Sequence, residues 1–198
     1  PGYYGKEKAM IYAYVKAGVV VNWPVTEEVI RHRGQSVLEY TPVVSAPAPA
    51  SDPVRQSCVE VTPVFVNGVL TQQWRVETLP RARLVENLLN ELAGIRWQRE
   101  TGGLELSGMK VLTDRESQAQ LTGAWQSLQA GLISETEWKA ADGWMRVTLK
   151  ELEPVARAVA VHVAKCFAAE KQVSEMITGS EHPETLDTVA LFDAAYAA

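Results

Sequence analysis

The sequence lacks any cluster of basic residues. The nearest to a cluster is the pair Arg81 and Arg83, which are two positions apart. The 198-residue chain has a net charge of −5, and that charge is unevenly placed. Residues 1–80 hold seven basic and seven acidic side chains, whereas residues 81–198 hold twelve and seventeen, which accounts for the whole excess. Because a nucleic-acid binder needs a basic patch against the phosphates, we expect no nucleic-acid partner.

Long apolar runs and cysteines are also scarce. No segment approaches the roughly 18–20 apolar residues of a membrane helix, and no signal-peptide pattern opens the chain, so we expect no membrane partner. Cys58 and Cys166 are too few for a disulfide framework, which favours a reduced, cytoplasmic setting. A single bridge between these two cysteines stays open.

No sequence motif indicates a catalytic site. His162 and Cys166 are four residues apart on an expected helix, a spacing that suits a metal site or a cysteine nucleophile. No closely spaced further ligand or orienting group accompanies them, and a packed cysteine beside a half-buried histidine explains both. Glycine-rich phosphate motifs do not occur. We expect no catalytic residue, no metal and no cofactor, and therefore a protein that is not an enzyme.

What the sequence contains predicts an α+β fold, with 46% hydrophobic residues and six Trp to build cores. Residues 1–78 are expected to form a β-rich lobe. Its clearest hairpin turns at Asn67-Gly68, the strongest two-residue signal for a type I′ turn, and Pro63 predicts a bulge or an edge position in the first strand. Shorter signals predict a hairpin over 10–21, a helix over 26–33 capped by Thr26, and a strand over 37–40.

A proline-rich connector, residues 42–53, interrupts this lobe with the sequence PVVSAPAPASDP. Its four prolines supply no donors to a β-ladder, so the connector is expected to be extended and semi-rigid. One interpretation is a solvated spacer, and the other is a segment that contacts other protein chains.

Residues 79–101 are expected to form a helix that links the lobe to the rest of the chain. Leu84, Leu88 and Leu92 recur every four residues, which is the spacing of one helical face. This face packs either within the chain or against copies of itself.

Residues 102–178 are expected to form a C-terminal domain in which short hairpins alternate with helices. Two strand-like runs each end in Thr-x-x-Glu, the first from Thr113 to Glu116 and the second from Thr148 to Glu151. In a capping box the Thr hydroxyl and the Glu carboxylate satisfy backbone N–H groups at a helix start. We therefore expect these four residues to cap two helices.

The last segment, residues 179–198, is expected to be a docking tail. Its apolar stripe consists of Leu186, Val189, Phe192 and Tyr196. A stripe at a chain end suits a helix that docks on a partner, so we expect the tail and the connector to contact other chains. The rival expectation is that both fold back on their own chain.

Several segments of the C-terminal part carry a resemblance to a known family: Gly102-Gly103, GMKVLTD (108–114), DRESQAQLTGA (114–124), WKAADGW (138–144) and HVAKCF (162–167). From about Arg96 onward the chain resembles a domain of unknown function found at the C-terminus of bacteriophage tail and tail-fibre-associated proteins. Upstream, VNGVLTQQWRVETLP (66–80) is similar to a hairpin segment of small phage tail proteins.

The resemblance implies a structural component of a phage tail, in the baseplate, the tail tip or the tail-fibre attachment. Such a protein acts by protein–protein interaction, with fibre or baseplate subunits as partners in a multi-copy assembly. It is assembled in the host cytoplasm and resides in the virion. A tail-fibre assembly chaperone is the alternative.

Overall fold

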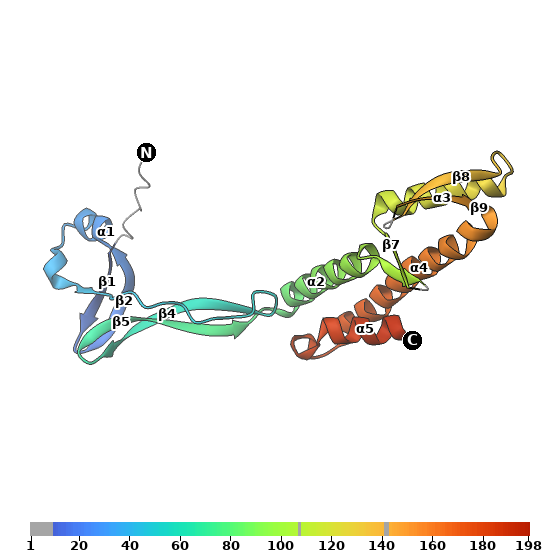
Figure 1. Ribbon diagram of the computed structural model, residues 1–198. Helices are drawn as coiled ribbons and strands as arrows, with labels where there is room; N and C mark the ends of the chain where they lie inside the picture. The colour runs from blue at the N-terminus through green and yellow to red at the C-terminus, as the bar shows by residue number, and fades with distance from the viewer. Residues whose placement is uncertain (1–9, 107, 141–142) are drawn as a thin grey trace, which may run out of the picture. The chain divides into compact units, whose positions relative to one another are not determined.

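The computed structural model describes residues 10–106, 108–140 and 143–198. The chain divides into two compact units, unit 1 (Pro1–Leu79) and unit 2 (Pro80–Ala198), which are coloured blue to cyan and green to red in Figure 1. Small two- and three-stranded sheets combine with five α-helices in the described residues, so the predicted α+β class is confirmed. Residues 1–9 of the predicted β-rich lobe lie outside the described residues.

Unit 1 begins with a small sheet in the strand order β2-β1-β3. Strands β1 (Ile11–Lys16) and β2 (Val19–Thr26) form the expected antiparallel hairpin, and β3 (Thr41–Pro42) pairs with the other edge of β1. Helix α1 (Glu27–His32) begins at Thr26, whose hydroxyl accepts from the Val29 N–H. The core beneath these elements is a cluster of four residues, Tyr12, Val25, Ile30 and Tyr40.

The strand predicted over 37–40 is wrong, because Val37–Glu39 is a 3₁₀ turn. The Ser36 hydroxyl accepts from the Leu38 N–H at 3.3 Å, which satisfies a backbone donor locally and competes with extended structure. Only the next two residues pair as strand β3.

The second sheet of unit 1 is the long hairpin of β4 (Gln56–Val66) and β5 (Val69–Thr78). Asn67 and Gly68 have φ values of 50° and 81°, as the two central residues of a type I′ turn require. The register shifts between Val61 and Val64, so Pro63 lies in the bulge that the sequence predicts.

The connector packs on its own chain, which supports the alternative expectation that it folds back. The Val44 N–H donates to the Leu70 carbonyl and the Gln72 N–H donates to the Val44 carbonyl, both at 2.9 Å. Further along, the Trp74 indole N–H donates to the Ala46 carbonyl at 2.9 Å. A proline-rich segment cannot build a full ladder, but its non-proline residues supply enough groups to lie along β5.

Unit 2 is built on helices α2 (Arg81–Thr101), α4 (Leu149–Gly179) and α5 (Thr188–Ala197), which pack against one another (Figure 1). The predicted linking helix is α2, and its face of Leu84, Leu88 and Leu92 is buried. Arg81 donates to the Thr178 and Ser180 carbonyls at 2.9 and 3.0 Å, which holds the start of α2 at the end of α4.

The other elements of unit 2 are two short hairpins and a helix between them: β6 (Leu104–Leu106), β7 (Met109–Val111), α3 (Arg115–Gln129), β8 (Glu135–Ala140) and β9 (Gly143–Thr148). A second core joins α3, β9 and α4 through Leu121, Leu128, Val147, Leu152 and Val159. A 3₁₀ turn, η2 (Pro183–Thr185), leads into α5. No helix in the described part of the chain is long and apolar enough to cross a membrane.

The capping box predicted from Thr113 to Glu116 is wrong. Asp114 is the N-cap of α3, because its carboxylate accepts from the Ser117 N–H at 2.9 Å. The Ser117 hydroxyl and N–H together lower the pKa of Asp114. Thr113 is fully buried, and its hydroxyl accepts from the Gly103 N–H at 2.8 Å instead. Glu116 accepts from a side chain one turn further along α3. Since Asp is at least as good an N-cap as Thr, the helix begins one residue later.

The second box forms at the start of α4, where Glu151 accepts from the Thr148 N–H at 2.9 Å. This backbone hydrogen bond, together with that of the Thr148 hydroxyl, lowers the pKa of Glu151.

The predicted docking tail forms helix α5 and packs within unit 2, which supports the alternative expectation that it folds back on its own chain. Phe192 is 0% exposed, and the helix packs on α2 and α4. Tyr196 is half-buried and its hydroxyl reaches His162. Of the remaining stripe residues, Leu186 is half-buried and Val189 is exposed. The stripe therefore buries its aromatic members within its own chain.

Candidate functional site

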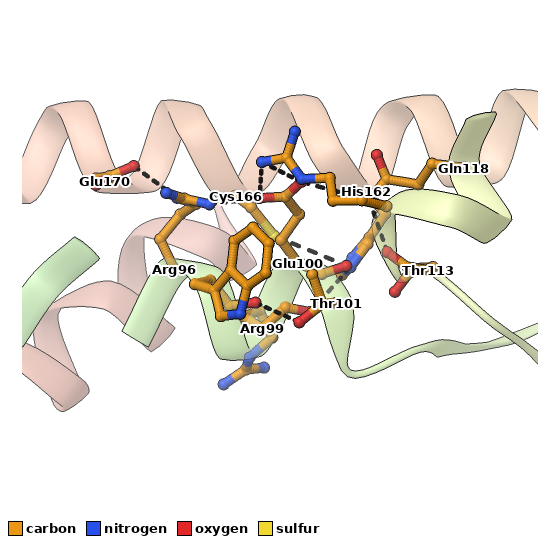
Figure 2. A network of polar contacts seen from close by, with 11 residues as sticks. Arg96, Arg99, Glu100, Thr101, Thr113, Gln118, His162, Cys166 and Glu170 are labelled. Atoms are coloured by element: carbon orange, nitrogen blue, oxygen red, sulfur yellow. Dashed lines mark hydrogen bonds and ion pairs between the residues drawn. The ribbon is translucent and has the colours of Figure 1, made fainter. Parts of the chain in front are cut away.

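Polar side chains from four helices converge at the C-terminal end of α2, and Figure 2 shows those of α2, α3 and α4 around the buried carboxylate of Glu100. Glu100 has no exposed side-chain surface. An uncompensated carboxylate in such a place is strongly destabilising. The arrangement of its partners therefore decides what this site does.

Arg96 is the first partner of Glu100 and lies one turn earlier on α2. Its Nη1 is 2.5 Å from Glu100 Oε2 and its Nε is 2.9 Å from Glu170 Oε2 on α4. Burial opposes the charged guanidinium, but the hydrogen bonds to both carboxylates outweigh it and raise the pKa of Arg96. One guanidinium therefore joins α2 to α4.

Helix α3 supplies two further partners. Arg115 Nη2 is 3.0 Å from Glu100 Oε1, and Gln118 Nε2 donates to the same oxygen at 3.3 Å and to the Thr113 carbonyl at 2.6 Å. Glu100 thus accepts from two guanidinium groups and one amide. Its charge and its lone pairs are matched by groups of the fold.

His162 on α4 completes the network and joins three helices. Its Nε2 lies 3.1 Å from the Arg99 carbonyl and 3.3 Å from the Glu100 carbonyl. Because carbonyl oxygens only accept, Nε2 carries the proton, and Nδ1 accepts from the Tyr196 hydroxyl at 2.7 Å. The last carbonyls of a helix have no partner within the helix, so His162 caps the end of α2 and binds α5 at the same time.

Cys166 lies one turn beyond His162 and is fully buried. Its Sγ is 4.0 Å from His162 Nε2, which is the protonated nitrogen and therefore cannot accept the thiol proton. Burial, with the nearby charge of Glu100, raises the pKa of the Cys166 thiol. A cysteine nucleophile needs a thiolate and an adjacent base, and this geometry provides neither.

A metal site has no support in the geometry. Across residues 10–106, 108–140 and 143–198, no group of three or more His, Cys, Asp and Glu side chains is placed to hold a metal ion. Cys58 and Cys166 are both free thiols, so the bridge that the sequence left open is not formed.

The outer side of the network is a stack of two aromatic rings and two guanidinium groups. The guanidinium carbon of Arg96 lies 4.7 Å from the centroid of the Phe167 ring and 5.9 Å from that of the Trp97 ring. The guanidinium carbon of Arg115 lies 5.2 Å from the centroid of the Trp97 ring. Both rings are about half exposed. The carboxylates that fix the guanidinium groups also fix these rings, because each cation is held against an aromatic face.

The sequence reasoning missed Arg96 and Glu100, although a signal for them exists. The buried face of α2 recurs every four residues through Leu84, Leu88 and Leu92, and the same step leads to Arg96 and then Glu100. A charged pair that continues an apolar stripe is a candidate buried ion pair. Of the predicted residues, Tyr196 belongs to the network directly and Thr113 belongs through Gln118. Glu116, Thr148, Glu151, Leu186 and Val189 make none of the network's contacts described above.

Comparison with known proteins gives one family match. Residues 83–196, which run from α2 to α5, match the sequence profile of a domain of unknown function, DUF4376. No curated protein and no solved structure gives a significant match. The match covers more than half of the chain, and the chain therefore belongs to the DUF4376 family.

Proposed function

We propose that the chain is a structural component of a bacteriophage tail that acts by protein–protein interaction. The observation that carries this proposal is the polar centre of unit 2, which engages its donors and acceptors within the fold. Glu100 is matched by Arg96, Arg115 and Gln118, and both nitrogens of His162 are occupied. Such a centre joins the four helices of unit 2, as a scaffold requires.

The assignment to a phage tail rests on the resemblance of the segments between Gly102 and Phe167 to the C-terminal domain of tail and tail-fibre-associated proteins. These segments fall on the hairpins and helices of unit 2. The proposed site of action is the baseplate, the tail tip or the tail-fibre attachment. Other tail proteins are the proposed partners.

The proposal predicts that the chain is a constituent of the mature particle. Quantitative mass spectrometry should find it in purified virions of the phage that encodes it, at a constant molar ratio to a major tail protein through successive purification steps. Absence from virions, with abundance in infected-cell extracts, contradicts the structural role and favours the tail-fibre assembly chaperone.

A gene-deletion experiment locates the step at which the chain acts. Phage that lack the gene should produce particles with incomplete tails, and a plasmid copy should restore them. A copy with Glu100→Gln, which keeps the shape of the side chain, serves as a control that disturbs the buried network alone. Normal tails in the deletion phage contradict the proposal.

A further inference from the structure

We propose that the end of the β4–β5 hairpin in unit 1 is a self-association surface, which binds the same surface of a second copy of this chain. The hairpin end consists of Val64, Phe65, Val66 and Val69. Its side chains are between 45% and 48% exposed. The proposal is independent of the phage-tail function, because it concerns the purified chain alone.

The register of the hairpin places these residues on both of its faces. Val66 pairs with Val69, and Val64 pairs with Thr71, so three valines gather on one face. Phe65 pairs with Leu70 and points to the opposite face. The connector reaches β5 by backbone hydrogen bonds at Leu70 and Gln72, yet it leaves Phe65 and the valines exposed.

Unit 1 has little else to stabilise it. A lone two-stranded hairpin is marginal in water, and the core of a domain of fewer than about 80 residues rarely supplies more than about 3–5 kcal/mol, so such domains often add a disulfide, a metal or association. Cys58 is a free thiol, and the described residues hold no metal-ligand cluster. Among the described residues of unit 1, ten large hydrophobic side chains are exposed and only six hydrophobic residues are buried. Association would bury part of the apolar surface that unit 1 leaves exposed.

The distribution of charge favours a second copy as the partner. Residues 64–71 contain no charged side chain, and residues 1–80 have no net charge. A neutral apolar surface offers no charge for a charged partner to recognise, whereas an identical surface is complementary to it about a two-fold axis. The whole net charge of −5 lies in residues 81–198, so unit 1 has no net charge of its own that would oppose contact with a second copy.

The test is the mass of the full-length protein in solution as a function of its concentration, measured by light scattering after gel filtration and by sedimentation equilibrium. The wild-type mass should rise above the 21.8 kDa of one chain. Val66→Glu should weaken association at least about tenfold, because two carboxylates would meet in an apolar contact. Val161→Glu is the matched control, since Val161 is 52% exposed on α4 in unit 2, and it should associate like the wild type.

A second variant guards against misfolding of the first. Val66→Thr keeps the β-branched shape that strands favour and should weaken association less than Val66→Glu does. A wild-type protein that stays at the mass of one chain over the whole concentration range overturns the proposal, even if another protein is found to bind it. The proposal is equally overturned if both Val66 variants associate as tightly as the wild type.

Discussion

Unit 2 buries a polar centre and matches every charge in it, whereas unit 1 leaves valines and a phenylalanine in solvent at the end of its longest hairpin. In unit 2 the buried hydrophobic residues outnumber the exposed large ones, thirteen to eleven, among the residues described; in unit 1 the ratio reverses, six to ten. Four helices share the Glu100 network, so each of them is held by both apolar and polar contacts.

The two units therefore differ in how burial offsets the loss of conformational entropy on folding. Ordering a chain costs roughly 1–2 kcal/mol per residue in backbone entropy, and burial must offset it. Unit 2 has long helices with continuous apolar faces and closes them with α5. Unit 1 has a four-residue core cluster and two small sheets. We infer that unit 2 is stable within one chain and that unit 1 gains stability from a second copy.

The largest expected effect tests whether α5 belongs to unit 2. Phe192→Ala removes a fully buried ring and should lower the free energy of unfolding by about 3–5 kcal/mol. Val189→Ala changes an exposed residue of the same helix and should cost less than about 0.5 kcal/mol. Urea denaturation followed by far-UV circular dichroism measures both. Equal and small effects would return α5 to the role of a docking tail.

The next effect tests the buried charges. Arg96→Met leaves Glu100 with Arg115 as its only cationic partner and should cost about 3 kcal/mol, whereas Arg83→Met removes an exposed pair and should cost less than about 1 kcal/mol. Adding Glu100→Gln to Arg96→Met should restore part of the loss, because the fully buried carboxylate is gone, while Glu170 still lacks Arg96. No recovery in the double variant would mean that the cost of Arg96→Met comes from the lost pair with Glu170 and the lost packing on Phe167.

A smaller effect is expected at Thr113. Thr113→Val keeps the shape of the side chain but leaves the Gly103 N–H without its acceptor, which should cost about 1–3 kcal/mol. Thr122→Val changes an exposed hydroxyl on α3 and should cost less than about 0.5 kcal/mol. The same denaturation assay applies, and equal values for the two variants would contradict the buried role of Thr113.

The smallest effect concerns alkaline pH. Burial raises the pKa of the Cys166 thiol and that of the Tyr196 hydroxyl. A raised pKa in the folded state gives stability that is present below the ordinary pKa and is lost as pH rises through the raised value. The free energy of unfolding should therefore fall above about pH 9, and less steeply in Cys166→Ala and Tyr196→Phe. Unchanged slopes in both variants would show that neither group contributes.

Local chemistry explains why much of the fold could be predicted from the sequence. The turn at Asn67-Gly68, the cap at Thr26 and the box at Thr148 each depend on residues close together in the chain. The stripe of α2 is also a local pattern. Each of these features requires only a backbone geometry that neighbouring residues favour, so nothing distant could override it.

The rest depends on contacts between distant residues. Thr113 is not a cap, because Gly103 offers its N–H and Asp114 caps the helix. The aromatic residues of the tail pack within the chain, because α2 and α4 receive them and His162 accepts a hydrogen bond from Tyr196. Glu100 could be recognised as a site residue only by following the four-residue step of α2 past Leu92. Its partners Arg115 and Gln118 come from α3 and have no local signal. Glu170, which pairs with Arg96, comes from α4 and has none either.

The central claim is that unit 2 is stable within one chain, whereas unit 1 depends on a second copy. Hydrogen–deuterium exchange of the full-length protein at low and high concentration tests it most directly. We expect the amides of β4 and β5 to become more protected as concentration rises, and the amides of α2 and α4 to keep the same protection. Protection of β4 and β5 that does not change with concentration would contradict it.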